Sequence, residues 1–276
     1  MVVIRTDSHL HSPIYFILFH LSFVDICYSS VTVHNMLRNF LAERKTISVI
    51  SCIPQIIFIP LSAATEAFIL SAMGYDHYAA ICDPLRYVDT MSKRICVQLL
   101  SGAWTMGFFY ALLSTVFALK FHFCGPNQIS HFSCKLPPLL QLSCTETFTN
   151  QVVLLTSIAI FGSSSFLFIL IFYIHIISTI LRIRSVEGRR KAFSTCNSHL
   201  IVVGLLYLTA FFQCTKPSSV SVVLDILHPA LSLLFWIFSI QYSVLTPMLN
   251  PIVYSLKNKE VKTAIGKTLG KFKFLK

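Results

Sequence analysis

The sequence predicts an all-α membrane protein: six long helices in one bundle, followed by a short amphipathic helix. Hydrophobic residues make up 55% of the 276 residues, charged residues make up 12%, and the mean hydropathy is +0.71. A soluble domain does not need this much apolar surface. The apolar residues also fall into runs of about 20 or more, which is enough for a helix to cross a hydrocarbon core of about 30 Å.

The positive charges are the third observation. The formal net charge is +11, and 16 of the 22 Lys and Arg residues lie in alternate connections at 5–12, 83–94, 182–191 and 257–276. An excess of Lys and Arg is typical of cytoplasmic loops, so these connections are expected inside. The charge therefore indicates membrane lipid as a partner, through the basic tail, and argues against nucleic acid.

The spans can be placed in order from the apolar runs. Pro13 stands near the first turn of the first span, where its missing N–H does no harm. Pro54 and Pro60 are expected to bend the second, because each removes a hydrogen bond within the helix. The expected spans are 13–40, 48–78, 95–118, 152–181, 192–213 and 230–256.

Two further segments complete the chain. The stretch 119–151, with three cysteines, is expected to be a long extracellular loop. In 257–271, lysines alternate with apolar residues such as Val261 and Ile265, which predicts an amphipathic helix on the inner membrane surface. The basic run Arg189-Arg190-Lys191 directly precedes the span at 192–213.

Four stretches together resemble the signatures of one family. They are PIYFILFHLSFVDICYSS (13–30), MGYDHYAAICDPLRY (73–87), KAFSTCNSHL (191–200) and PMLNPIVYSLKNKEVKTAI (247–265). They resemble olfactory receptors, which are rhodopsin-like, seven-helix, G-protein-coupled receptors. The resemblance implies one receptor domain over 1–276 that holds helices two to seven and lacks the N-terminal tail and most of the first helix. Where the family has Ala and Arg, this chain has Gly74 and His77.

Two carboxylates lie well inside spans. Asp25 is twelve residues past Pro13, roughly 18 Å in, and Glu66 is ten residues before Asp76, roughly 15 Å from the same face. A carboxylate at such a depth costs about 3 kcal/mol on insertion scales and is therefore a functional candidate. The resemblance implies a sodium site of Asp25, Glu66 and Asn250, and no other cofactor. The alternative is that one carboxyl group is protonated and only hydrogen-bonded.

Four cysteines fall in segments expected to face the oxidising exterior: Cys52, Cys124, Cys134 and Cys144. Four cysteines allow three pairings, and the spacing does not choose among them. The resemblance implies Cys52–Cys134, which ties the loop to the second span, and Cys124–Cys144 within the loop. Free thiols are the alternative.

The resemblance also implies a small pocket in the outer half of the bundle. Its members are mostly apolar or small, as a volatile hydrophobic ligand requires. Ordinary helix packing is the alternative for each one singly, because small residues are common at helix contacts. The pocket residues would be Ile59, Ala63, Ala64, Ser157, Phe161, Tyr207, Ala210, Phe211, Ser239 and Tyr242.

At the inner ends of the spans, the resemblance implies a switch that opens for the G protein. A proline kink is expected in Asn250-Pro251-x-x-Tyr254. His77 is shorter than Arg and mostly neutral at pH 7, so weaker coupling is expected. The switch residues would be Asp76, His77, Tyr173, Arg190, Lys191, Asn250, Pro251 and Tyr254.

The implied function is an odorant receptor in the plasma membrane that couples to a stimulatory G protein and raises cyclic AMP. One alternative is a truncated copy that is retained in the endoplasmic reticulum and does not signal. A six-helix channel or transporter would instead predict inverted repeats or a pore-lining loop, and neither is visible. An enzyme is not expected, because Gly266-Lys267-Thr268 lacks both the upstream glycine and the preceding strand of a phosphate loop.

Overall fold

The structure is a computed structural model of the chain. It describes residues 12–41, 49–119, 134, 147–214, 241, 246–256, 261, 263 and 266. Within these ranges all regular structure is helical, and five helices are long and apolar enough to cross a membrane. The predicted all-α membrane bundle is confirmed.

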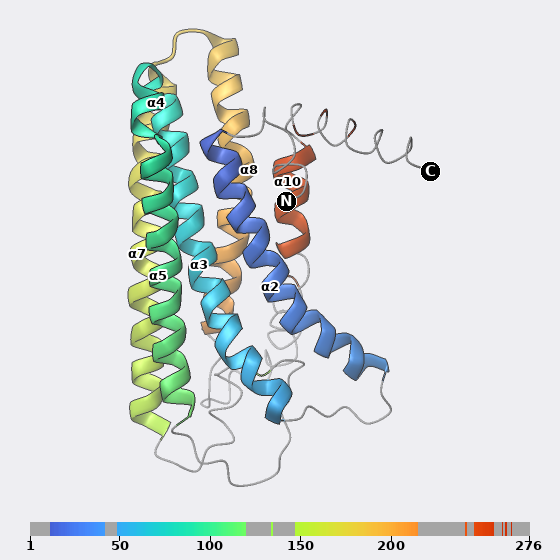
Figure 1. The fold of residues 1–276 in the computed structure, drawn as a ribbon. Helices are drawn as coiled ribbons and strands as arrows, with labels where there is room; N and C mark the ends of the chain where they lie inside the picture. The colour runs from blue at the N-terminus through green and yellow to red at the C-terminus, as the bar shows by residue number, and fades with distance from the viewer. Residues whose placement is uncertain are drawn as a thin grey trace, which may run out of the picture.

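The helices form one elongated bundle (Figure 1). Helix α3 runs through its middle and contacts α2, α5, α7 and α8, while α10 packs on α2 and α8. The elements in order are α2 (Pro13–Leu41), α3 (Val49–Cys82), η2 (Pro84–Arg86), α4 (Tyr87–Thr90), α5 (Lys93–Ala118), α7 (Thr147–Arg182), α8 (Val186–Cys214) and α10 (Thr246–Leu256).

Burial explains the central position of α3. In its most apolar stretch 56% of the residues are buried, against 28% in α5 and in α7, so α3 is more enclosed by protein than either of these helices. Ile69, Leu70 and Met73 have no exposed surface. The apolar side chains on the outer faces of α5 and α7, such as Phe108 and Ile174, are exposed and face the lipid.

Helix α5 lies close against α3 at Gly107. A Cβ atom at this position would overlap the Thr65 side chain and lie 3.1 Å from the Leu61 carbonyl oxygen. Small residues along one face let two helices pack this tightly in a membrane, where no hydrophobic force drives them together. The buried small residues of this face are Ala103, Gly107, Ala111, Ser114 and Ala118.

Three helix ends differ from the sequence prediction. Helix α3 continues four residues past 78 to Cys82 and stops before Asp83, whose backbone is restricted by Pro84. The connection after it contains η2 and α4. Helix α7 begins at Thr147, inside the stretch expected to be loop.

Helix α8 begins at Val186, earlier than expected, and so contains the basic run that was placed before it. Ser185 accounts for this start. Its hydroxyl oxygen accepts a hydrogen bond from the Gly188 N–H at 3.2 Å, and its carbonyl oxygen accepts one from the Arg189 N–H at 3.0 Å. A serine that satisfies free N–H groups in this way is a favoured residue at a helix start.

Several expectations lie largely outside the described residues. They include most of the loop 119–151, the second disulfide, the span 230–256 before Thr246 (except Gln241), and the amphipathic helix 257–271, of which Val261, Thr263 and Gly266 are described and helical.

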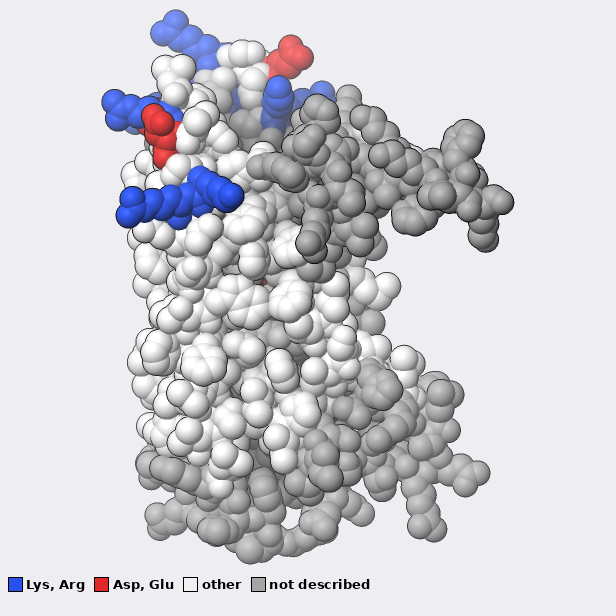
Figure 2. Space-filling model, viewed as in Figure 1, with Lys and Arg blue, Asp and Glu red and all other residues white. Residues whose placement is uncertain are grey.

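The charged side chains divide the surface into zones. Figure 2 shows Lys and Arg gathered at the end of the bundle that carries α4, above a broad band of uncharged side chains. The exposed basic residues at this end come from η2, the start of α5, the end of α7 and the start of α8. The positive-inside rule assigns this end to the cytoplasm.

Candidate functional site

A buried polar centre joins α2, α3 and α10. Asp25, Glu66 and Asn250 are 4%, 6% and 2% exposed. The Asn250 amide nitrogen lies 3.1 and 3.3 Å from the two Asp25 carboxylate oxygens and 3.2 Å from Glu66 Oε1. The structure therefore brings together the two carboxylates and the amide that the resemblance grouped.

The centre has more acceptors than donors. One amide nitrogen carries two N–H groups, while three carboxylate oxygens lie within its reach. The Asn250 Oδ1 atom is buried and has no hydrogen-bond partner in the described structure. Carboxylate and amide oxygens are the ligands that hard cations take. In the described part of the chain, no three His, Cys, Asp or Glu side chains gather into a group that could hold a metal ion.

A second buried cluster lies between α3, α7 and α8. His199 Nε2 lies 2.9 Å from the Leu70 carbonyl oxygen, which can only accept, so Nε2 carries the proton. His199 Nδ1 then accepts the Tyr173 hydroxyl at 2.8 Å. The two rings are stacked, with centroids 5.6 Å apart. His199 thus holds α8 to both α3 and α7.

His77 belongs to this cluster and not to the surface. It is 8% exposed, and its ring lies edge-on to His199 with the centroids 5.3 Å apart. Its Nε2 atom is buried and has no hydrogen-bond partner in the described structure. The short, neutral imidazole can pack among aromatic rings, where a guanidinium would require charged partners.

Asp76, the neighbour of His77, has a hydrogen-bond partner that the sequence analysis did not identify. Its carboxylate accepts a hydrogen bond from the Tyr87 hydroxyl at 2.8 Å. Burial, and then the nearby Asp76 carboxylate, raise the pKa of Tyr87, so its hydroxyl keeps its proton. Pro84 was the feature of the sequence that could have indicated this contact. It follows the end of α3 and starts η2, after which Tyr87 can reach Asp76.

The remaining switch residues do not all join this cluster. Tyr173 is buried, and the Tyr254 hydroxyl is buried without a hydrogen-bond partner in the described structure. Arg190 and Lys191 are exposed on the first turns of α8. Pro251 lies within α10, but its side chain is not described.

The residues expected to line the pocket in the outer half of the bundle differ in burial. Ile59, Ala64 and Ser157 are buried, and Ala63 and Phe161 are partly buried. The Tyr207 hydroxyl oxygen lies 2.7 Å from the Ser165 hydroxyl oxygen, and this hydrogen bond links α8 to α7. Ser239 and Tyr242 lie outside the described residues.

Two of the expected pocket residues, Ala210 and Phe211, are exposed near the end of α8. Ala210 is exposed but shares the face of Val203 and Leu206, which point inward. Phe211 is 63% exposed and lies about 100° further around the helix than Ala210. Consecutive residues of a helix cannot both face the interior fully, so the place of Phe211 in the pocket stays a prediction.

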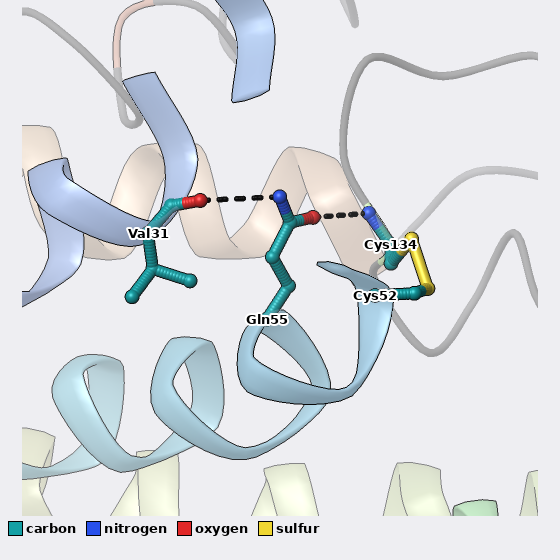
Figure 3. Close-up of a disulfide and its surroundings, with 4 residues drawn as sticks. All are labelled: Val31, Cys52, Gln55 and Cys134. Atoms are coloured by element: carbon teal, nitrogen blue, oxygen red, sulfur yellow. Dashed lines mark hydrogen bonds between the residues drawn. A yellow bond between two sulfur atoms is a disulfide. The ribbon is translucent and has the colours of Figure 1, made fainter. Parts of the chain in front are cut away.

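At the outer end, the Cys52–Cys134 disulfide ties the loop residue Cys134 to α3, with the Cα atoms 5.4 Å apart. Gln55, which has no exposed surface, joins this bridge to α2 (Figure 3). Its amide nitrogen donates to the Val31 carbonyl oxygen at 3.1 Å, and its amide oxygen accepts the Cys134 N–H at 2.7 Å. The sequence analysis did not single out Gln55, since a lone glutamine carries no pattern.

Comparison with known proteins gives one consistent result. The family model for olfactory receptors matches residues 1–271. Olfactory receptor 5G9 of Mus musculus is 46% identical over 280 residues, covering 100% of this chain and 85% of the relative. Olfactory receptor 5A1 of Homo sapiens is 47% identical over 267 residues, covering 97% and 82%. Olfactory receptor 8S1 of Homo sapiens is 47% identical over 262 residues, covering 95% and 70%.

Proposed function

Because the chain belongs to the olfactory receptor family, we propose that it detects small hydrophobic odorants and signals through a stimulatory heterotrimeric G protein that raises cyclic AMP. The observation that carries this proposal is the match over nearly the whole chain at 46% identity. It is an odorant receptor of the G-protein-coupled class and a multi-pass membrane protein, not an enzyme. The plasma membrane is its proposed site of action.

The proposed odorant site lies in the outer half of the bundle, between α3, α7 and α8. Tyr207 supplies the polar part of this region, because its hydroxyl is held by Ser165 while its ring contacts Phe166. Apolar or small residues such as Ala63 and Ala64 supply the rest. A mostly apolar site with few polar groups suits a volatile hydrophobic ligand.

The proposed partner surface for the G protein lies at the basic end. Leu85 and Val88 are 97% and 81% exposed there, on η2 and α4, and Val186 at the start of α8 is 78% exposed. This end is not lipid-facing, so such exposed apolar groups favour a protein partner. Exposed Arg190 and Lys191 add positive charge that favours an acidic partner.

A sodium ion is proposed at the polar centre. Asp25 and Glu66 would supply carboxylate oxygens, and Asn250 would supply its unpartnered Oδ1 atom. The bound cation would supply the positive charge that two adjacent buried carboxylates require. Among the described residues, the Asn250 amide is the donor that lies between the two carboxylates.

Cyclic AMP in cells expressing the tagged chain, exposed to an odorant panel, tests the function. Surface labelling gives the receptor level at the plasma membrane, so that signal per receptor can be compared. Tyr207→Ala should lower the potency of any agonist, whereas Phe108→Ala, on the exposed face of α5, should not. Equal loss from both changes would contradict the proposed odorant site.

One observation favours a second candidate, a receptor copy that does not signal and is retained in the endoplasmic reticulum. His77 is buried against His199, and no cation bonds to Asp76 among the described residues. His77→Arg separates the two candidates. A cyclic AMP response that appears only in the Arg variant, at equal surface level, would favour the silent copy.

A further inference from the structure

Hydroxyl groups join three helices beside the proposed odorant site. The Ser71 hydroxyl of α3 donates to the Ser165 carbonyl oxygen of α7 at 3.1 Å. The Ser165 hydroxyl oxygen in turn lies 2.7 Å from the Tyr207 hydroxyl oxygen of α8. Ser165 has no exposed surface. Its bonds to α3 and α8 therefore fix its position between the two helices.

The direction of the bond between Ser165 and Tyr207 follows from a count of protons. The Ser165 hydroxyl lies 3.1 Å from the Phe161 carbonyl oxygen and 3.0 Å from the Gly162 carbonyl oxygen. Both carbonyl groups can only accept, and a serine hydroxyl has one proton, which points to them. The Tyr207 hydroxyl must then donate its own proton to the Ser165 hydroxyl oxygen.

This direction leaves Tyr207 with acceptor capacity only. Its single proton is used, and no donor bonds to its phenolic oxygen among the described residues. The Tyr207 side chain keeps some exposed surface, whereas Ser165 has none, so another molecule can reach only the tyrosine of this pair. A ligand that meets the phenolic oxygen must therefore bring a donor.

A second hydroxyl, two residues along α8, cannot serve as a donor to a ligand either. Thr209 has no exposed surface, and its hydroxyl lies 2.8 Å from each of the Leu205 and Leu206 carbonyl oxygens. Its proton is thus used within the helix. A carbonyl ligand beside Tyr207 would find neither hydroxyl free to donate.

The side of α7 that faces Tyr207 has room for a ligand. The rings of Phe166 and Tyr207 meet edge to face with centroids 5.1 Å apart, so Phe166 marks this side of the helix. Gly162 precedes Phe166 by four residues and shares its side, one turn nearer the outer end. No atom of a neighbouring helix lies within 4 Å of a Cβ atom added at Gly162. The glycine therefore leaves open a space that a side chain would fill.

We propose that the odorant site selects alcohols and phenols, whose O–H group donates to the Tyr207 phenolic oxygen, and that Ser165 sets this preference as a positioning residue. The inference rests on the proposed odorant function and narrows its ligand class. Aldehydes, ketones and esters carry no such donor and leave the phenolic oxygen unpaired. Amines and carboxylic acids are charged at neutral pH, and a buried charge is costly without a charged partner.

Ultraviolet resonance Raman spectra of the full chain in lipid nanodiscs test the proton direction. The Fermi doublet of tyrosine distinguishes a phenol that donates from one that accepts, and the difference from Tyr207→Phe isolates the signal of Tyr207. A donor signal is expected without ligand, and Ser165→Ala should weaken it by removing the acceptor. Ser163→Ala is the matched control, because this exposed serine of α7 bonds to the Ile160 carbonyl oxygen. An acceptor signal overturns the proposal.

Matched probe pairs test the ligand class, with binding followed by the unfolding temperature of the same preparation. The pairs are octanol with octanal, benzyl alcohol with benzaldehyde, and cyclohexanol with cyclohexanone. Tyr207→Phe gives the part of each shift that comes from the lipid alone. The alcohol of the pair that binds best should have a Kd at least about fivefold lower, as one hydrogen bond provides. Ser165→Ala should remove this preference, because Tyr207 can then donate to a carbonyl group, and Ser163→Ala should keep it.

Each outcome decides one part of the inference. Equal or tighter binding of the carbonyl compounds, or binding of no alcohol, overturns the ligand class. An alcohol preference that Ser165→Ala leaves unchanged overturns the role of Ser165. These measurements need no signalling, so they are separate from the proposed function. Alcohols that bind with the expected preference but raise no cyclic AMP would overturn the proposed coupling and support this inference.

Discussion

The Tyr87 hydroxyl donates a hydrogen bond of 2.8 Å to the Asp76 carboxylate, and this bond joins α4 to the inner end of α3. Asp76 is 3% exposed, so the bond serves a carboxylate that water hardly reaches. Because His77 turns away into the aromatic cluster, the phenol takes the place that a cation would have beside this carboxylate. The conformation of the short segment η2–α4 is thereby tied to α3.

Tyr87→Phe is expected to lower the stability of the bundle by about 1–3 kcal/mol, since it leaves a buried carboxylate oxygen without its donor. Thermal unfolding in detergent measures the effect. Tyr78→Phe is the matched control on α3, because the ring contacts of Tyr78 with Phe172 and His175 survive the change. Equal unfolding temperatures for the two variants would mean that the Tyr87 bond contributes no stability.

His77 and His199 lie face to edge, yet opposite effects are expected when each is changed to Phe. His199→Phe removes the bonds to Leu70 and Tyr173 and should cost about 2 kcal/mol or more. His77→Phe keeps the ring and removes a buried nitrogen that has no partner, so stability should be unchanged or higher. Unfolding temperatures of both variants test this, and a larger loss for His77→Phe would contradict the described cluster.

Gly107→Ala is expected to force α5 away from α3. The added methyl group meets the Thr65 side chain and the Leu61 carbonyl oxygen, and backbone atoms cannot yield cheaply. Overpacking of this kind costs about 1–3 kcal/mol. Gly102→Ala, five residues earlier on α5, is the matched control, because no atom of a neighbouring helix lies within 4 Å of its added Cβ atom. Similar expression and unfolding of both variants would refute the close approach.

Much of the fold could be predicted from the sequence, because apolar runs and charge asymmetry are visible in the order of residue types along the chain. Helix α2 was expected at 13–40 and spans Pro13–Leu41. The start of α8 was missed because it depends on the Ser185 cap, whereas the hydropathy begins only after the basic run. Composition cannot reveal a cap of this kind.

The residues of the candidate site also differ in how far the sequence could reveal them. Carboxylates inside spans stand out in any sequence, so Asp25 and Glu66 were found, and the resemblance added Asn250. Tyr87 and Gln55 were missed, because their roles come from where the backbone turns and not from an unusual residue type. The direction in which Phe211 points could not be fixed from a short motif, and its side chain is 63% exposed.

Sodium should stabilise the protein through the polar centre if the proposed site is correct. A ligand that binds only the folded state raises stability by mass action, and each kcal/mol raises the unfolding temperature of a chain this size by about 2–4 °C. Asp25→Asn should abolish the difference between sodium and a large organic cation, because it removes one carboxylate charge. Asp89→Asn, at an exposed acid on α4, should keep the difference. Equal unfolding temperatures of the unmodified protein in both salts would dismiss the site.

Gln55 is expected to be the residue that fixes the outer end of α3 against both α2 and the disulfide. Its single side chain satisfies the Val31 carbonyl oxygen and the Cys134 N–H. Gln55→Leu keeps the approximate volume but leaves both backbone groups without this partner, and each unsatisfied buried group costs about 1–3 kcal/mol. Gln98→Leu, at an exposed position of α5, is the matched control and should have little effect on unfolding.

The role of Gln55 can be separated from general packing by a double-mutant cycle with the disulfide. Once Cys52→Ser and Cys134→Ser release the loop, the Cys134 N–H is free to reach water, so Gln55→Leu should then cost clearly less than in the disulfide-bonded protein. Residues that share a partner are coupled by about 0.5–3 kcal/mol in such cycles. Additive losses of stability would show that Gln55 acts only through α2, and that its bond to Cys134 contributes nothing.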